Sequence, residues 1–262
     1  MQAHYYSNLS EAEKKHWYFA ARRQLIKDLI SRHILTPKKE ARLKILDVGC
    51  GTVGTTDFLT RFGSVTAIEP SEVAIKLLKT NYPYLNVVKA SIENMAPLLT
   101  DANFDLATVL GVLYHKEVKS PQGALKSINR KLKVGGWLIW HEAAYPFLKR
   151  KHDALSHGAR RFLPSQMRSL LCASGFRIYF ETHVGLFIFP LAFVLALLSK
   201  MKPLAAGKES PLEASSVDRK LLPKYLNAIL YLVSRLEMKY AVNISPIPIG
   251  VSYLVMAKKI NS

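Results

Sequence analysis

The sequence predicts an α/β fold in which helices cover both faces of a mostly parallel sheet. Three observations predict it: short β-rich apolar runs alternate with helical patterns, 49% of the residues are hydrophobic, and 262 residues suffice to bury a core. The same composition excludes a disordered or fibrous chain, and two cysteines exclude a disulfide framework.

The elements follow in order from turn signals and apolar runs. A helical segment starts at Ser10, where Glu13 completes a capping-box pattern, and it ends before Pro37. Gly135-Gly136 marks a turn before a strand, and Gly175 ends a helix. The predicted strands cover residues 43–48, 65–68, 87–88, 104–110, 137–141, 176–182 and 251–257, and the helices between them cover 54–62, 74–81, 122–132 and 165–174.

A glycine-rich loop follows the first strand. The segment Asp47-Val48-Gly49-Cys50-Gly51-Thr52-Val53-Gly54 contains G-x-G-x-x-G between a strand and a helix. Glycines let the backbone pass close under a ligand, and the helix N-terminus offers unpaired N–H groups. Glu69, 22 residues after Asp47 and at the end of the next strand, is placed to bind ribose hydroxyls. The pattern predicts a nucleotide cofactor, and the alternative is an ordinary strand-to-helix turn.

Two nucleotide cofactors compete for this loop. NAD-type sites disfavour a carboxylate such as Asp47 beside a diphosphate, whereas S-adenosylmethionine has no phosphate but carries an α-ammonium and a sulfonium. Residues 46–115 have a net charge of −3 in a chain whose formal charge is +18. We therefore expect S-adenosylmethionine, with S-adenosylhomocysteine as the product.

Several motifs together resemble class I S-adenosylmethionine-dependent methyltransferases over about residues 10–183 and the closing strand. They are Asp47 to Gly51, Glu69-Pro70-Ser71, Phe104-Asp105-Leu106, Tyr114-His115 and Leu132 to Gly136. The resemblance implies a Rossmann-like seven-stranded sheet whose last strand is antiparallel. It also implies that Gly49, Cys50, Gly51 and Thr52 hold the methionine end of the cofactor, where we expect Asp47 to attract the α-ammonium. Glu69 and Pro70 would lie at the ribose, Ser91 and Ile92 at the adenine, and Leu110 beside the sulfonium.

The region after the fifth strand resembles a bacterial subgroup of methyltransferases of small or lipid-linked metabolites. The similar residues are Ala144 to Leu148, His152-Asp153, His157 and Arg160-Arg161-Phe162, with Asn227, Glu237 and Pro248 to Ser252 in the tail.

The candidate catalytic residues come from that region. We select His152, Asp153, His157 and Arg161, because a histidine can accept a proton near neutral pH and an arginine can hold an anionic substrate group. The alternative is that they pin a loop by hydrogen bonds. No metal site is expected, because His152 and His157 lack i, i+4 spacing and no Cys or Glu completes a ligand set.

We divide the chain into an N-terminal helical lid (1–40), a cofactor-binding core (41–183), an apolar helical insertion (184–249) and a closing strand (250–262). The aromatic and basic run from His16 to Arg23 fits a lid or an amphipathic helix packed on the core. The insertion opens with the fifteen uncharged residues 184–198, flanked by Lys200 and Lys202. A core helix, an interfacial segment and a membrane span are all open, although a span needs about 20 residues.

The sequence thus predicts a methyltransferase that acts on a small hydrophobic or lipid-linked acceptor. We expect the methyl group to go to an oxygen atom, with nitrogen and carbon as the less favoured alternatives. Without a secretion leader we expect a cytoplasmic protein, with an anionic membrane surface at the inner face as a candidate partner. The alternatives are an RNA methyltransferase, an NAD(P)-dependent oxidoreductase and a non-catalytic interaction protein. Nucleic acid is not the expected partner, because no aromatic-rich RNA-binding module is recognisable despite the basic charge. The oligomeric state stays open.

Overall fold

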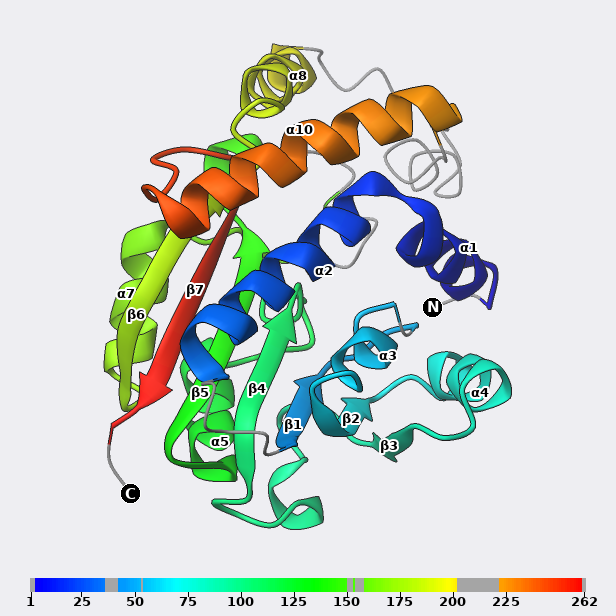
Figure 1. Cartoon of the computed structure of the whole chain (residues 1–262), viewed down its shortest axis with the longest axis vertical. Coiled ribbons are helices and arrows are strands. Elements are labelled where there is room, and N and C mark those ends of the chain that lie inside the picture. Colours follow the sequence, from blue (N-terminus) through cyan, green and yellow to red (C-terminus); the bar gives the residue numbers. More distant parts are fainter. Residues whose placement is uncertain are drawn as a thin grey trace.

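A seven-stranded sheet forms the centre of the molecule in the computed structural model, which describes residues 3–35, 42–52, 54–149, 153, 158–201 and 222–260 (Figure 1). The strand order is β3-β2-β1-β4-β5-β7-β6. Strands β1 to β5 are parallel, and β7 pairs antiparallel with both β5 and β6. The predicted fold class, including its antiparallel last strand, is confirmed. The strands are β1 (Leu43–Val48), β2 (Gly63–Glu69), β3 (Asn86–Lys89), β4 (Phe104–Leu110), β5 (Leu132–Ala143), β6 (Phe176–Val184) and β7 (Ser252–Lys259).

Helices cover both faces of this sheet. One face packs against α2 (Trp17–Leu29), the short π-helix at Ile30–Ile34 and α10 (Lys224–Asn243), and the other against α5 (Pro121–Lys131) and α7 (Pro164–Cys172). Side chains alternate between the two faces along each strand. Leu106 of β4 therefore packs in the core under α2 and α10, and Ala107 packs in the core under α5 and α7. The remaining helices are α1 (Ala3–Lys15), α3 (Thr56–Leu59), α4 (Glu72–Asn81) and α8 (Phe189–Met201), with 3₁₀ turns at Ala96–Leu98 and Pro146–Leu148.

The strand order reverses direction at β1. β1 lies between β2 and β4, so the chain leaves β1 towards one side and returns on the other to form β4. Ligands of open α/β sheets bind at this reversal, outside the carboxyl ends of the strands. The glycine-rich loop leaves β1 at that point.

The N-terminal helical segment differs from the sequence prediction, because it consists of two helices separated at His16. The backbone of His16 is extended, and its imidazole Nδ1 accepts a hydrogen bond of 3.3 Å from the backbone N–H of Tyr18, which caps α2. Ser10 lies inside α1. The predicted helix start at Ser10 is therefore wrong. The Glu13 side chain does not form a capping box with Ser10 and bonds instead to the glycine-rich loop.

A side chain of helix α10 stabilises the break between α1 and α2. The Asn227 side chain accepts a hydrogen bond from the backbone N–H of Trp17 (2.9 Å) and donates one to the carbonyl of Lys15 (3.0 Å). Farther along, Arg235 forms an ion pair with Asp28 of α2. Figure 1 shows α10 running alongside α2 at one end of the molecule. The insertion is helical in its described part, while Lys202 lies outside the described residues.

The β1–β2 contact gives a stability prediction. A Cβ atom added at Gly63 would lie 1.9 Å from the carbonyl oxygen of Leu43, so Gly63→Ala must displace a strand and should lower the free energy of unfolding by about 3 kcal/mol. Gly123→Ala is the matched control, because its Cβ would meet only the Ser120 side chain, at 3.2 Å, and alanine favours a helix. Urea unfolding measures both, and equal stability of the two variants would contradict this packing.

Candidate active site

The glycine-rich loop lies at the carboxyl ends of the strands, as predicted. Gly49 and Gly51 have φ angles of 68° and 62°, which favour glycine. A Cβ atom at Gly49 would lie 2.6 Å from the Val112 side chain, so the loop runs close against the segment that follows β4. Val53 lies outside the described residues. The loop is therefore shaped by backbone conformation and by a close approach that larger residues would prevent.

Asp47 is buried beneath this loop at the end of β1. Its carboxylate accepts hydrogen bonds from the hydroxyls of Thr56 (2.6 Å) and Thr108 (2.7 Å). Burial raises the pKa of Asp47 above its ordinary value, and the two hydrogen bonds oppose that effect. The threonine hydroxyls partly compensate the desolvation and hold the carboxylate in one orientation.

Glu69 connects the end of β2 to the glycine loop. Its Oε2 accepts a hydrogen bond from the backbone N–H of Gly51 and its Oε1 from that of Ser71, both at 3.0 Å. Burial raises the pKa of Glu69, and these two N–H groups lower it. A carboxylate has about four acceptor positions, so each oxygen retains capacity for a ligand hydroxyl.

Glu13 is a third carboxylate of the site, and the sequence did not identify it as a site residue. It reaches from α1 into the loop, where its Oε2 accepts hydrogen bonds from the Thr52 hydroxyl (2.9 Å) and the backbone N–H of Gly54 (3.0 Å). Burial raises its pKa, and the Gly54 bond followed by the charge of Arg22 oppose the rise. No local pattern reveals this role, because the contact joins residues 39 and 41 positions apart.

Arg22 of α2 supplies a buried positive charge opposite these carboxylates. Its guanidinium lies 5.1 Å from the ring centroid of Phe19, and its Nη2 is 3.4 Å from the Thr55 hydroxyl. Its charge lowers the pKa of both Glu13 and Asp47. Its Nε has no hydrogen-bond partner within the described part of the chain. A buried donor without a partner is costly, so this nitrogen fits a ligand acceptor.

The other predicted cofactor residues lie along the same edge of the sheet. Ser91 and Ile92 follow β3, and the Ser91 hydroxyl accepts a hydrogen bond from Asn94. Leu110 ends β4, and Pro70, which is exposed, follows β2. Burial and the nearby carboxylates raise the pKa of Cys50 well above its ordinary value, so its thiol stays protonated. Their binding roles stay predictions.

The predicted catalytic residues are described only in part, because His152 and His157 lie outside the described residues. Arg161 donates from Nη2 and Nε to the two oxygens of Asp153 (3.0 and 3.2 Å), and from Nη1 to the carbonyl of Ala144 (3.2 Å). This mostly buried pair ties its loop to the end of β5. These contacts favour the loop-pinning interpretation, and a role in proton transfer stays a prediction.

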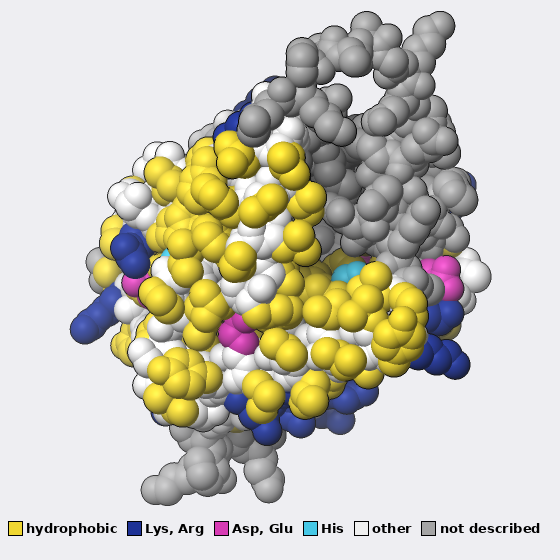
Figure 2. Space-filling model, turned by 90° about the horizontal axis from the view of Figure 1, so that it is seen from above, with side chains coloured by type: hydrophobic (Ala, Val, Ile, Leu, Met, Phe, Trp, Pro, Cys, Tyr) yellow, Lys and Arg dark blue, Asp and Glu magenta, His cyan; other side chains and the backbone are white. Residues whose placement is uncertain are grey.

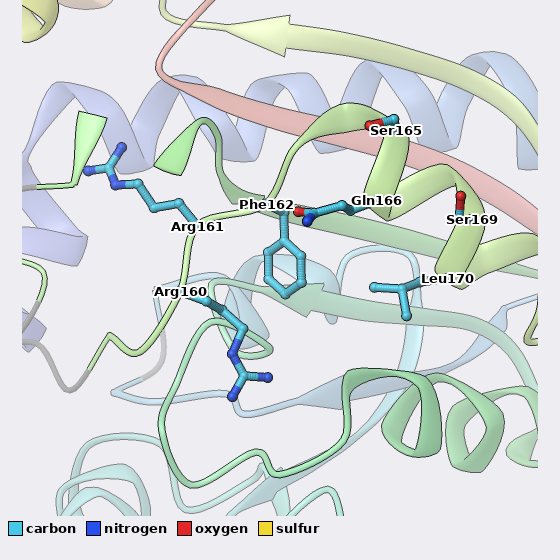
Figure 3. A pocket seen from close by; sticks show the side chains of 7 residues that line it. All are labelled: Arg160, Arg161, Phe162, Ser165, Gln166, Ser169 and Leu170. Carbon is cyan, nitrogen blue, oxygen red and sulfur yellow. The ribbon is translucent and has the colours of Figure 1, made fainter. Parts of the chain in front are cut away.

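An open pocket adjoins Arg161 (Figure 3). It is lined by Arg160, Arg161, Phe162, Ser165, Gln166, Ser169 and Leu170. Figure 3 shows the two arginine side chains pointing in different directions, and their guanidinium groups bond elsewhere in the protein. No residue of the loop lines this pocket. We therefore place the candidate active site at the loop.

His141, near the end of β5, contacts helix α2. Its Nε2 lies 2.8 Å from the Ser252 hydroxyl, and its ring stacks on Tyr18 of α2 at 6.3 Å. Burial, assisted by the charge of Arg22, lowers the pKa of His141 to about 3. The imidazole is thus neutral at physiological pH, and it is a weak base because it would lose any proton it accepted.

Glu142, the next residue, has a raised pKa, whereas that of His141 is lowered. Its Oε1 accepts hydrogen bonds from the backbone N–H groups of Val112 (3.0 Å) and Leu113 (2.7 Å), just after β4. Its Oε2 has no partner among the described residues. Burial raises the pKa of Glu142 to about 7 despite those bonds. The sequence analysis did not select Glu142 as a site residue.

Replacing Glu142 by glutamine should remove a pH-dependent loss of stability. Because the folded-state pKa lies above the unfolded value, the wild-type protein loses stability relative to the variant as pH rises from about 4.5 to 7, by roughly 3 kcal/mol in all. Below and above this window the difference should be level. Urea unfolding of both proteins across the window measures it, and a constant difference throughout would show that the carboxyl group titrates normally.

Comparison with known proteins concerns the fold and residues 46–140 of the chain. Residues 46–140 match a family model described as a methyltransferase domain. No curated protein matches the chain. Among solved structures, a SAM-dependent methyltransferase from Archaeoglobus fulgidus is 16% identical, with a TM-score of 0.52 over 90% of this chain and 94% of that one.

Two further structures show how diverse the proteins with this fold are. A protein from Thermotoga maritima, described as a possible histamine N-methyltransferase, is 18% identical, with a TM-score of 0.54 over 96% of this chain and 95% of that one. The [4+2]-cyclase SpnF is also 18% identical, with a TM-score of 0.59 over 98% and 92%. The chain therefore has the Rossmann-like fold of S-adenosylmethionine-dependent methyltransferases, and its residues 46–140 match a methyltransferase domain.

Proposed function

We propose that the protein is an S-adenosylmethionine-dependent methyltransferase. The supporting observation is the charge arrangement at the loop, where Glu13, Asp47 and Glu69 surround the backbone and Arg22 adds a partly unpartnered guanidinium. The loop N–H groups that would bind a diphosphate already donate to carboxylates. Such a site disfavours NAD-type ligands and suits a ligand with an ammonium, a carboxylate and ribose hydroxyls.

Each of these residues has a role in the proposal. Glu69 would bind the ribose hydroxyls, Glu13 and Asp47 the α-ammonium, and Arg22 the α-carboxylate. When bound, the cofactor supplies an activated methyl group on a sulfonium. The protein then needs to bind, orient and shield the reactants, because correct placement supplies much of the rate of such a displacement.

The acceptor in this proposal is a small hydrophobic or lipid-linked molecule that is methylated on oxygen. An aromatic cluster supports an apolar acceptor, since the Tyr145 ring lies 5.1 Å from Phe147 and 6.1 Å from Phe189 at the start of α8. An oxygen acceptor also needs a base. His152 and His157 stay candidates from the sequence, and Glu142 is a described carboxyl group whose pKa, about 7, suits the task.

Binding measurements test the cofactor part. Arg22→Met should weaken S-adenosylhomocysteine binding by tenfold or more, because it removes a charge-assisted hydrogen bond. Arg61→Met is the matched control, because Arg61 is exposed and its guanidinium lies over Phe58. Calorimetric titration with S-adenosylhomocysteine and with NAD⁺ should show binding of the former alone. Tighter binding of NAD⁺, or equal effects of the two substitutions, would contradict the proposal.

A labelling assay tests the reaction. The protein is incubated with methyl-labelled S-adenosylmethionine and a bacterial total lipid extract, and the organic phase should become labelled. Asp47→Ala should abolish that labelling if Asp47 holds the cofactor. Lipid label equal to that of a protein-free sample, with S-adenosylhomocysteine still bound, would reject the lipid-linked acceptor and keep the cofactor assignment.

A further inference from the structure

Helices α8 and α10 form an exposed apolar surface, which we call the helical face. Figure 2 shows apolar side chains covering much of this end of the molecule, with Lys and Arg side chains along one rim. Its exposed apolar members are Leu191, Phe193, Val194, Leu195, Leu197 and Leu198 on α8, Tyr225, Ile229, Leu232, Val233, Leu236 and Tyr240 on α10, and Ile244 directly after α10. So many large exposed apolar side chains on one end mark an interaction surface.

The two sides of α10 show that this exposure follows a pattern. The apolar residues from Tyr225 to Ile244 recur every three or four positions and so form one stripe, which is exposed to solvent. Ser234, Met238 and Val242 lie on the opposite side and are buried towards α2. A surface helix needs only one apolar stripe to fold, so the second stripe is not explained by packing within the described chain.

Helix α8 is still more exposed. Among the residues of α8 whose side chains the structure describes, Ala196 is the only buried apolar one, whereas Leu191, five residues earlier, is 62% exposed. Its first charged residue is Lys200, near its C-terminus. No helix in the described ranges is both long and apolar enough to cross a membrane. A helix of this kind suits the interfacial region of a lipid layer, where its apolar side contacts acyl chains.

The charged side chains of the helical face favour a negatively charged partner. The side-chain ammonium groups of Lys200, Lys224 and Lys239 have no ion-pair or hydrogen-bond partner in the part of the chain that the structure describes. The carboxylate of α10, Glu237, accepts hydrogen bonds from the backbone N–H groups of Gly185 (2.7 Å) and Leu186 (3.0 Å). The free charges on these helices are therefore all positive, and a second copy of the chain would place lysines against lysines.

We propose that the helical face docks on an anionic lipid bilayer, with α8 and α10 in the plane of its interface. Apolar side chains enter the acyl boundary while the lysines contact lipid phosphates. The docking does not depend on catalysis, and only its link to a lipid-linked acceptor rests on the proposed function. Because α10 packs on α2, docking would hold the lid side of the site next to the bilayer.

Vesicle sedimentation with the full-length protein tests this proposal. The protein should bind vesicles of equimolar phosphatidylglycerol and phosphatidylcholine, and should bind phosphatidylcholine vesicles at least about tenfold more weakly. The double variant Leu232→Gln with Leu236→Gln should lose about tenfold or more in binding, because both side chains are exposed in the apolar stripe. Lys200→Gln with Lys239→Gln should lose a similar factor, on the anionic vesicles alone.

Leu98→Gln is the matched control, because Leu98 is 52% exposed in the 3₁₀ turn that precedes β4, far from the helical face. It should bind vesicles like the wild type, and every variant should still bind S-adenosylhomocysteine. Absence of vesicle binding, or an equal loss in Leu98→Gln, would overturn the proposal. So would a wild-type dimer in analytical ultracentrifugation that the Leu232/Leu236 substitutions dissociate. Vesicle binding without methyl transfer would reject the proposed function alone.

Discussion

The constraint on which the site depends is the burial of carboxyl groups at the carboxyl ends of the strands. Glu13, Asp47, Glu69 and Glu142 are all buried there, and burial raises the pKa of each. Such groups are tolerated only when hydrogen bonds or charges compensate them. Threonine hydroxyls, loop N–H groups and Arg22 provide that compensation, so the loop, the lid and the strand ends must meet in one geometry.

The lid geometry follows from this constraint. Glu13 reaches the glycine-rich loop from α1. Arg22 lies on α2, and its charge acts on the carboxylates of Glu13 and Asp47. One continuous helix would keep residues nine positions apart along a single axis, so the chain turns at His16 to bring both to the loop. His16 caps the new helix, and Asn227 bonds to the backbone on both sides of the turn. The break is thus stabilised by a residue 210 positions away.

The limits of sequence prediction have the same origin. The alternation of strands and helices, the loop and Glu69 were predictable, because each rests on local periodicity or on a motif at fixed spacing. The bend at His16 was not, because its stabilising partner lies on α10. Glu13 and Glu142 were missed as site residues because their contacts are tertiary, and His152 and His157 lie outside the described residues. Local patterns locate the glycine-rich loop, but they do not reveal which distant side chains contact it.

Helix α2 connects the two ends of this arrangement. It carries Arg22 on the side that faces the glycine loop and Asp28 on the side that pairs with Arg235 of α10. Between these residues, Leu25 and Ile26 are fully buried in the core on this face of the sheet. A packed helix moves as a unit, because shifting one side chain would open cavities around the others. The position of Arg22 and the position of α10 are therefore set together. Arg22 lies among buried carboxylates, whereas α10 lies at the solvent-exposed surface.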